Sequence, residues 1–102
     1  MTMRPGPVAA AAGLVVARAA ALPDGEAGRH VETCARQLAS SCLRRGDVRE
    51  DVDRLVAAVE TMKASLRNGA RRRAQHVLPA VERLLEVFQE ELLPELRREG
   101  LL

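Results

Sequence analysis

A repeat of apolar positions runs through the middle of the chain, with members alternately four and three residues apart. The members are Val48, Val52, Leu55, Val59, Met62 and Leu66. This spacing gathers them on one side of an α-helix and leaves the charged residues between them on the other side. Asp47, followed three residues later by Glu50, is typical of the first turn of a helix. The pattern therefore predicts an amphipathic helix over residues 48–66.

A second amphipathic pattern precedes this helix. Its apolar positions are Val31, Ala35, Leu38 and Cys42, spaced four, three and four residues apart. The spacing predicts a helix over about residues 26–45. Gly46 follows directly, and glycine commonly ends a helix because it adopts the left-handed conformation without strain.

A third repeat fills the C-terminal part of the chain. It comprises Ala74, Leu78, Val81, Leu85, Phe88 and Leu92, and it is widened by Val77, Leu84 and Leu93. A stripe this broad can contact two neighbouring helices. We expect the repeat from Leu78 to Leu92 to pack against the stripe of the helix over residues 48–66.

Three sites in this half of the chain interrupt the helical pattern. Pro79 either begins a separate helix after a short basic one, which we favour, or kinks one continuous helix at the cost of a backbone hydrogen bond. Pro94 ends or bends the helix before Leu96. The dipeptide Asn68-Gly69 predicts a helical hairpin, because both residues tolerate the left-handed conformation that ends a helix.

The first 24 residues form an Ala-rich segment. Residues 8–21 lie between Pro7 and Pro23 and predict a first helix, which would be largely buried because it is apolar on all sides. Two alternatives remain for this segment. One is a flexible arm, since an Ala-rich surface buries little area per residue, and the other is a cleaved targeting segment.

The composition supports an all-α fold. The chain of 102 residues has no Trp, no Tyr and one Phe, whereas Ala, Leu, Arg and Glu, which favour helices, are abundant. Short turns join the expected helices, so sequence neighbours run antiparallel. The sequence therefore predicts a small antiparallel up-and-down bundle of three to four helices with coiled-coil-like heptad stripes. Residues 25–102 would form this bundle after the N-terminal segment 1–24.

Charge and cysteine content narrow the function only slightly. The formal net charge of +2 is smaller than the basic excess usual for nucleic-acid-binding domains. No apolar run is long enough to span a bilayer, so we expect no membrane partner. Two cysteines, Cys34 and Cys42, are too few for a disulfide scaffold and favour a reducing, cytoplasmic location.

His30 and Cys34 are the one pair with a metal-ligand spacing. They are four residues apart in a helical pattern, which lets two side chains bind one zinc ion. Zinc needs further ligands, and the sequence does not place Cys42 or His76 beside this pair. A cysteine at a repeat position is more often a small buried side chain. We therefore expect no metal site and no cofactor.

A stretch without acidic residues, from Thr61 to Val81, concentrates positive charge. Its basic residues, here named the basic corner, are Lys63, Arg67, Arg71, Arg72, Arg73 and His76. Positive charge at the start of a helix opposes the helix dipole, so an anion or an acidic surface would stabilise it. The basic corner is therefore a candidate site for a protein partner or an anion, and a solvated face is its alternative. Without aromatic residues to stack on bases, nucleic acid is the less favoured ligand.

The C-terminal leucines form a second candidate surface. They are Leu92, Leu93, Leu96, Leu101 and Leu102. Because a core with one aromatic residue is thin, burial against another chain would stabilise it, so we expect a homo-oligomer or a complex with a larger helical protein. No nucleophile and base pair or phosphate-binding loop is visible in the sequence. The sequence favours a non-enzymatic protein-binding module, such as an adaptor, chaperone or regulatory subunit, with a nucleic-acid-binding or regulatory domain as the alternative.

Overall fold

Helices make up nearly all of the chain that the computed structural model describes, which is residues 6–22, 25–44, 46–68 and 71–102, without the side chains of residues 67–68 and 71–75. The elements are α1 (Pro7–Ala20), α2 (Glu26–Leu43), α3 (Arg49–Asn68), α4 (Arg71–Val87), the π-helical turn η1 (Phe88–Leu92) and α5 (Leu93–Arg98). The last three elements follow one another without a break and form one rod. The predicted turn at Pro23 and Asp24, and Gly69 of the predicted hairpin, lie outside the described residues.

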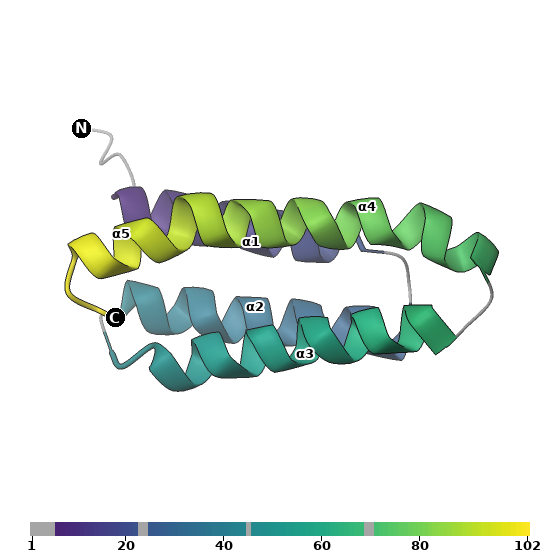
Figure 1. Ribbon diagram of the computed structural model, residues 1–102. Helices are drawn as coiled ribbons and strands as arrows, with labels where there is room; N and C mark the ends of the chain where they lie inside the picture. Colours follow the sequence, from purple (N-terminus) through teal and green to yellow (C-terminus); the bar gives the residue numbers. More distant parts are fainter. Residues whose placement is uncertain (1–5, 23–24, 45, 69–70) are drawn as a thin grey trace.

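The four helical rods form an antiparallel up-and-down bundle (Figure 1). α1 packs against α2, α2 against α3 and α3 against α4, and the last rod also packs along α1 and closes the bundle. Among the described residues, no Cα atoms of the diagonal pairs α1 with α3 and α2 with α4 lie within 8 Å of each other. The predicted all-α, up-and-down bundle is therefore confirmed, with four members at the corners of a square.

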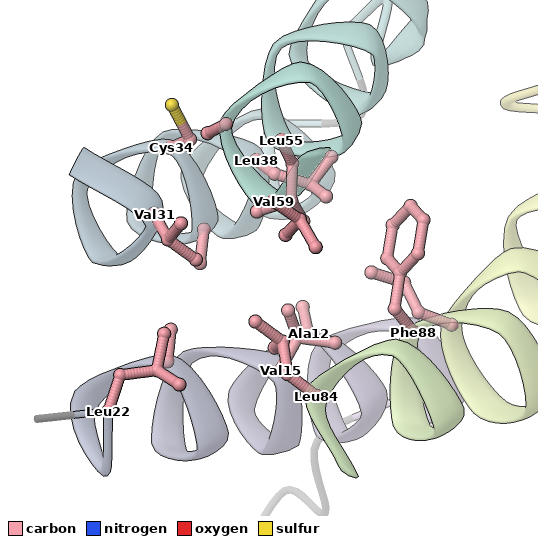
Figure 2. Close-up of a cluster of buried hydrophobic side chains, with 14 of the residues drawn as sticks. Ala12, Val15, Leu22, Val31, Cys34, Leu38, Leu55, Val59, Leu84 and Phe88 are labelled. Carbon is pink, nitrogen blue, oxygen red and sulfur yellow. The ribbon is translucent and has the colours of Figure 1, made fainter. Parts of the chain in front are cut away.

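Side chains from all four rods meet in one core. Val15 of α1, Leu38 of α2, Leu55 of α3 and Leu84 of α4 are each at most 1% exposed. Figure 2 shows that side chains of the α2 and α3 layer point toward those of the α1 and α4 layer. Each such burial contributes about 1.5–3 kcal/mol. Of the predicted α3 stripe, the buried members are Val48, Leu55, Val59 and Met62, and the half-buried members are Val52 and Leu66.

The Ala-rich N-terminal segment forms the first helix of the bundle. α1 begins at Pro7, where the missing N–H of proline removes no helical hydrogen bond. Its buried residues are Ala11, Ala12, Val15 and Ala19, and they belong to the same core as the buried residues of the other helices. Small alanine side chains let neighbouring helices approach closely, which offsets the small area that each alanine buries.

The connection between α2 and α3 satisfies the backbone groups at both helix ends. The N–H of Gly46 donates to the carbonyl of Ser41 at 3.1 Å, which closes α2. The carboxylate of Asp47 accepts a hydrogen bond from the N–H of Arg49 at 3.0 Å, so Asp47 caps α3 as its position in the sequence predicts. Val48, between these polar contacts, is fully buried.

The structure corrects the favoured interpretation of Pro79. α4 is continuous through this residue, which lies on the exposed side of the helix. Val77 and Val81, two residues away on either side, are both buried. Their burial at about 1.5–3 kcal/mol each offsets the cost of about 3 kcal/mol for a proline inside a helix, so one continuous helix is retained.

A wider helical turn accommodates Pro94. In η1 the N–H of Leu93 donates to the carbonyl of Phe88, which lies five residues earlier. In a regular α-helix the ring of Pro94 would meet the carbonyl four residues before it, and the wider turn relieves this clash. Phe88, Leu92 and Leu96 are four residues apart and all buried, so the chain continues along the core instead of ending at Pro94.

Gly100 turns the C-terminus back onto the bundle. Its φ of 74° is the left-handed conformation that favours glycine. The N–H of Leu101 donates to the carbonyl of Leu96 at 2.9 Å, and the N–H of Gly100 donates to the carbonyl of Arg97 at 3.1 Å. Together these bonds form a Schellman motif. Leu101 and Leu102 consequently pack against the core, and the chain after α5 bends back toward the other helices (Figure 1).

Candidate functional site

The five C-terminal leucines do not form one exposed surface. Leu92 and Leu96 are fully buried in the core of the chain itself. Leu93, Leu101 and Leu102 are half-buried and pack against the same core. The expectation that these leucines face water without a partner is therefore corrected for Leu92 and Leu96, because η1 and α5 pack along α1 and cover them.

Partly exposed aliphatic side chains gather instead between α3 and α4. These side chains, here named the α3/α4 seam, are Val52, Val56, Leu66, Leu78 and Leu85. Val56 is 39% exposed and the other four are half-buried, and of these Val52, Leu66 and Leu85 also pack against the core. Leu14 and Leu43 are also exposed, but they lie on α1 and at the end of α2. The seam is thus a group of large apolar side chains from two adjacent helices.

The neighbouring hollows show which sides of α3 and α4 form this seam. Arg54 and Thr61 of α3 line hollows shared with α2, and the seam residues of α3 lie on the other side of its buried stripe, toward α4. Ala80 of α4 lines a hollow shared with α1, so Leu78 and Leu85 lie on the side of α3. No described Cα atom of α3 comes within 8 Å of η1 or α5. α3 and the last rod therefore diverge at this end of the seam.

Charged residues follow the seam along α3 in a symmetric order. Arg49, Asp53, Val56, Glu60 and Lys63 are spaced four, three, four and three residues apart, so they lie on one side of the helix. Their signs run positive and negative before Val56, then negative and positive after it. None of the four charged residues has an ion-pair partner among the described residues. Their charges are therefore available to a molecule that contacts the seam.

His30 and Cys34 lie together in a hollow between α2 and α3. The Sγ atom of Cys34 is 3.9 Å from Nε2 of His30, and Arg54 also lines this hollow of about 420 Å³. The sulfur points away from the layer of α1 and α4 (Figure 2). Burial raises the pKa of the Cys34 thiol, the Arg54 charge opposes this rise and the Asp51 charge adds to it. The raised pKa disfavours the thiolate, which is the nucleophilic form of cysteine.

Cys42 lies two helical turns farther along α2. It is 4% exposed, and burial together with the nearby Asp51 carboxylate raises its pKa to about 11. Both thiols are free. Within the described ranges, no three or more His, Cys, Asp or Glu side chains are grouped in a way that could hold a metal ion. Burial thus disfavours the thiolate form of both cysteines.

The structure describes two side chains of the basic corner. Lys63 is half-buried on α3 and His76 is exposed on α4. The side chains of the other members, Arg67, Arg71, Arg72 and Arg73, lie outside the described residues, and the basic corner remains a prediction. His76 lines a hollow shared with α1, and Lys63 does not line that hollow.

Two arginines that the sequence analysis did not single out share this hollow with His76. They are Arg18 of α1 and Arg83 of α4. His76 and Arg83 are seven residues apart, which places them on one side of a helix. The sequence could therefore have shown that these two basic residues of α4 are neighbours. Arg18 comes beside them only through the packing of α1 on α4, which no local pattern specifies.

Comparison with other proteins adds no assignment. The chain matches no protein-family model, no curated protein and no solved structure. Across the part of the chain that the structure describes, no helix has both the length and the apolar character that crossing a bilayer requires. Functional inference therefore rests on the seam, the hollows and the charges around them.

Proposed function

We propose that this chain is a non-enzymatic protein-binding module whose α3/α4 seam holds one helix of a different protein. The observation that carries the proposal is the seam itself, where five Leu and Val side chains from two adjacent helices remain partly exposed. An amphipathic helix that packs against such a surface buries apolar residues spaced three and four apart. Grouped exposed apolar side chains on a small domain commonly mark an interaction site.

The charge order on α3 favours a different protein over a second copy of this chain. If two copies packed antiparallel through α3 about Val56, Arg49 would face Lys63 of the second copy, and Asp53 would face Glu60. Parallel packing would place each charge opposite its own equivalent. Both arrangements put like charges together, which can cost several kcal/mol across an interface. The seam is therefore poorly suited to self-association.

The order of charges on α3 also predicts which side chains the partner helix carries. Basic residues on that helix would lie opposite Asp53 and Glu60, and acidic residues would lie farther out, opposite Arg49 and Lys63. Apolar residues between them would contact Val56 and the leucines of α4. Burial of the apolar residues would supply most of the affinity, and the charges would set the register and exclude other helices. This is the binding mode of an adaptor, chaperone or regulatory subunit.

A photo-crosslinking amino acid at position 56 tests the proposal in the cells from which the chain comes. The expected product is a covalent adduct between this chain and one different protein. The same amino acid at position 20, which is exposed on α1, is the control and should give no adduct with that protein. The double substitution Asp53→Arg and Glu60→Arg should greatly reduce the adduct, because the basic residues of the partner would then be repelled.

Three results would contradict the proposal. The first is an adduct that contains two copies of this chain, and the second is equal capture at positions 20 and 56. The third is a failed test at position 56: either no adduct forms there, or an adduct forms and the two arginine substitutions leave its amount unchanged. Circular dichroism of each variant confirms that it is folded, since these exposed positions should change stability by only about 0.5 kcal/mol.

A further inference from the structure

Among the residues that the structure describes, basic and small side chains line a hollow between α1 and α4. It measures about 350 Å³, and its lining residues are Arg18, Ala21, His76, Pro79, Ala80 and Arg83. The two arginines and the histidine come from two helices, and the described lining residues include no carboxylate. It lies on the opposite side of α4 from the α3/α4 seam, so it is independent of the proposed protein-binding surface.

The guanidinium groups of Arg18 and Arg83 have no partner in the described chain. Neither forms an ion pair with a described carboxylate. By contrast, Arg36 lies 2.8 Å from Glu32 and Arg54 lies 2.7 Å from Glu50 within their own helices. α1 contains no acidic residue that could neutralise Arg18 in the same way. Two unpaired guanidinium groups around one hollow repel each other until an anion enters it.

We infer that this hollow binds a phosphate group of a small ligand. Two guanidinium groups offer paired N–H donors that match phosphate oxygens, and the imidazole of His76 adds one more donor. The other described lining residues are Ala21, Pro79 and Ala80, which leave room for a compact tetrahedral anion. Charge-assisted hydrogen bonds of this kind are about twice as strong as neutral ones.

Neighbouring carboxylates limit the affinity of this site. Arg18 and Arg83 also line a second hollow of about 210 Å³, together with Glu86, Glu90 and Glu91. These carboxylates repel a bound phosphate and attract the same two guanidinium groups. Glu86 is three residues from Arg83 on α4, so it is the closest of the three in the sequence. Its replacement by an uncharged side chain should therefore strengthen phosphate binding.

Inorganic pyrophosphate is the probe for the first experiment. Amide chemical shifts of the whole chain, followed by NMR during a titration at low salt, should show saturable binding to one site. The shifts should be largest around residues 18–21 and 76–83. The double substitution Arg18→Gln and Arg83→Gln should weaken binding by about tenfold or more, as expected for the loss of two charge-assisted hydrogen bonds. Glu86→Gln should strengthen it.

A matched control separates this site from general attraction of anions. Arg29→Gln with Arg97→Gln removes the same two charges from exposed residues that do not line the hollow, and it should leave binding nearly unchanged. Equal weakening by both double variants, shifts spread over the whole surface, or no saturable binding would overturn the inference. A short single-stranded oligonucleotide serves as the second probe. If it binds more tightly than pyrophosphate through Arg18 and Arg83, the ligand is a nucleic-acid backbone and the assignment to a small ligand is wrong.

Discussion

Leu84 and Leu85 are adjacent in α4 but lie in different surroundings. Leu84 is 1% exposed in the core, whereas Leu85 is half-buried in the α3/α4 seam. Successive side chains of an α-helix are rotated by about 100°, as 3.6 residues per turn requires. Because Leu84 points into the core, the rotation from one residue to the next turns Leu85 toward the α3/α4 seam. This pair fixes which leucines hold the bundle together and which are available to a partner.

Alanine substitutions at the two leucines should have different effects on stability. Leu84→Ala should lower the free energy of unfolding by about 2–5 kcal/mol, because it leaves a cavity in the core. Leu85→Ala should lower it by only about 1 kcal/mol, because a half-buried side chain loses less apolar contact. Urea unfolding followed by circular dichroism measures both changes. An equal loss for the two variants, or a larger loss for Leu85→Ala, would contradict the observed burial.

Two glycine substitutions should change the stability of the fold in opposite directions. Gly100→Ala should destabilise the chain by about 1–2 kcal/mol, because an alanine is strained in the left-handed conformation of the Schellman motif. Gly13 lies inside α1, where an added Cβ would meet nothing within 4 Å. Gly13→Ala should therefore stabilise by about 0.5–1 kcal/mol through its higher helix propensity.

Thermal melts of the two glycine variants at one pH measure these effects. At this chain length, 1 kcal/mol corresponds to a shift of about 4–8 °C in Tm. The expected result is a lower Tm for Gly100→Ala and a higher Tm for Gly13→Ala. A rise in Tm for Gly100→Ala would show that the C-terminus is not held by the left-handed turn.

The buried thiol of Cys42 should make stability depend on alkaline pH. Its pKa is raised to about 11 in the folded chain, so the unfolded chain loses this proton first as the pH rises. The thiol therefore stabilises the folded state fully below about pH 9, and this contribution decreases as the pH rises toward 11. The difference between a pKa of 9.0 and a pKa of about 11 corresponds to at most about 3 kcal/mol of folding free energy.

Cys42→Ala isolates this effect from the other groups that titrate at alkaline pH. The free energy of unfolding of the wild-type chain should fall more steeply between pH 9 and 11 than that of the variant. Chemical unfolding at several pH values, under reducing conditions, gives both curves. Parallel curves would show that the thiol has the same pKa in the folded and unfolded chains.

Much of the fold could be predicted from local sequence patterns. The repeats of apolar positions, with Asp47 and Gly46 between them, place the helices within a few residues of their observed ends. Pro79 and Pro94 could not be interpreted in the same way. The outcome at both prolines depends on how much apolar surface the helix buries on either side, and this is a property of the packed bundle.

The candidate sites were harder to predict. The order of charges about Val56 is visible in the sequence, but its meaning depends on α4 lying on that side of α3. In the sequence, Leu92 and Leu96 look the same whether they lie in the core or on an apolar surface. Only the path of η1 and α5 along α1 shows that they are core residues. Arg18 joins Arg83 through tertiary packing alone. Local spacing carries no information on such pairs.

An exchange of two charges tests whether the charge order along the α3/α4 seam prevents a second copy of this chain from binding there. The double variant Arg49→Asp with Asp53→Arg keeps the composition and the net charge. Antiparallel packing about Val56 would now place the new carboxylate at position 49 opposite Lys63 of a second copy. It would also place the new guanidinium at position 53 opposite Glu60. The seam would thereby become complementary to itself.

Sedimentation equilibrium of the exchanged variant and the wild-type chain, at low and high salt, is the most direct measurement. We expect the wild-type chain to be monomeric at micromolar concentration. We expect the exchanged variant to dimerise, salt to weaken this dimer by screening the new pairs, and Val56→Asp in the exchanged variant to restore the monomer. An exchanged variant that stays monomeric, or a wild-type chain that self-associates equally strongly, would contradict this role of the charge order.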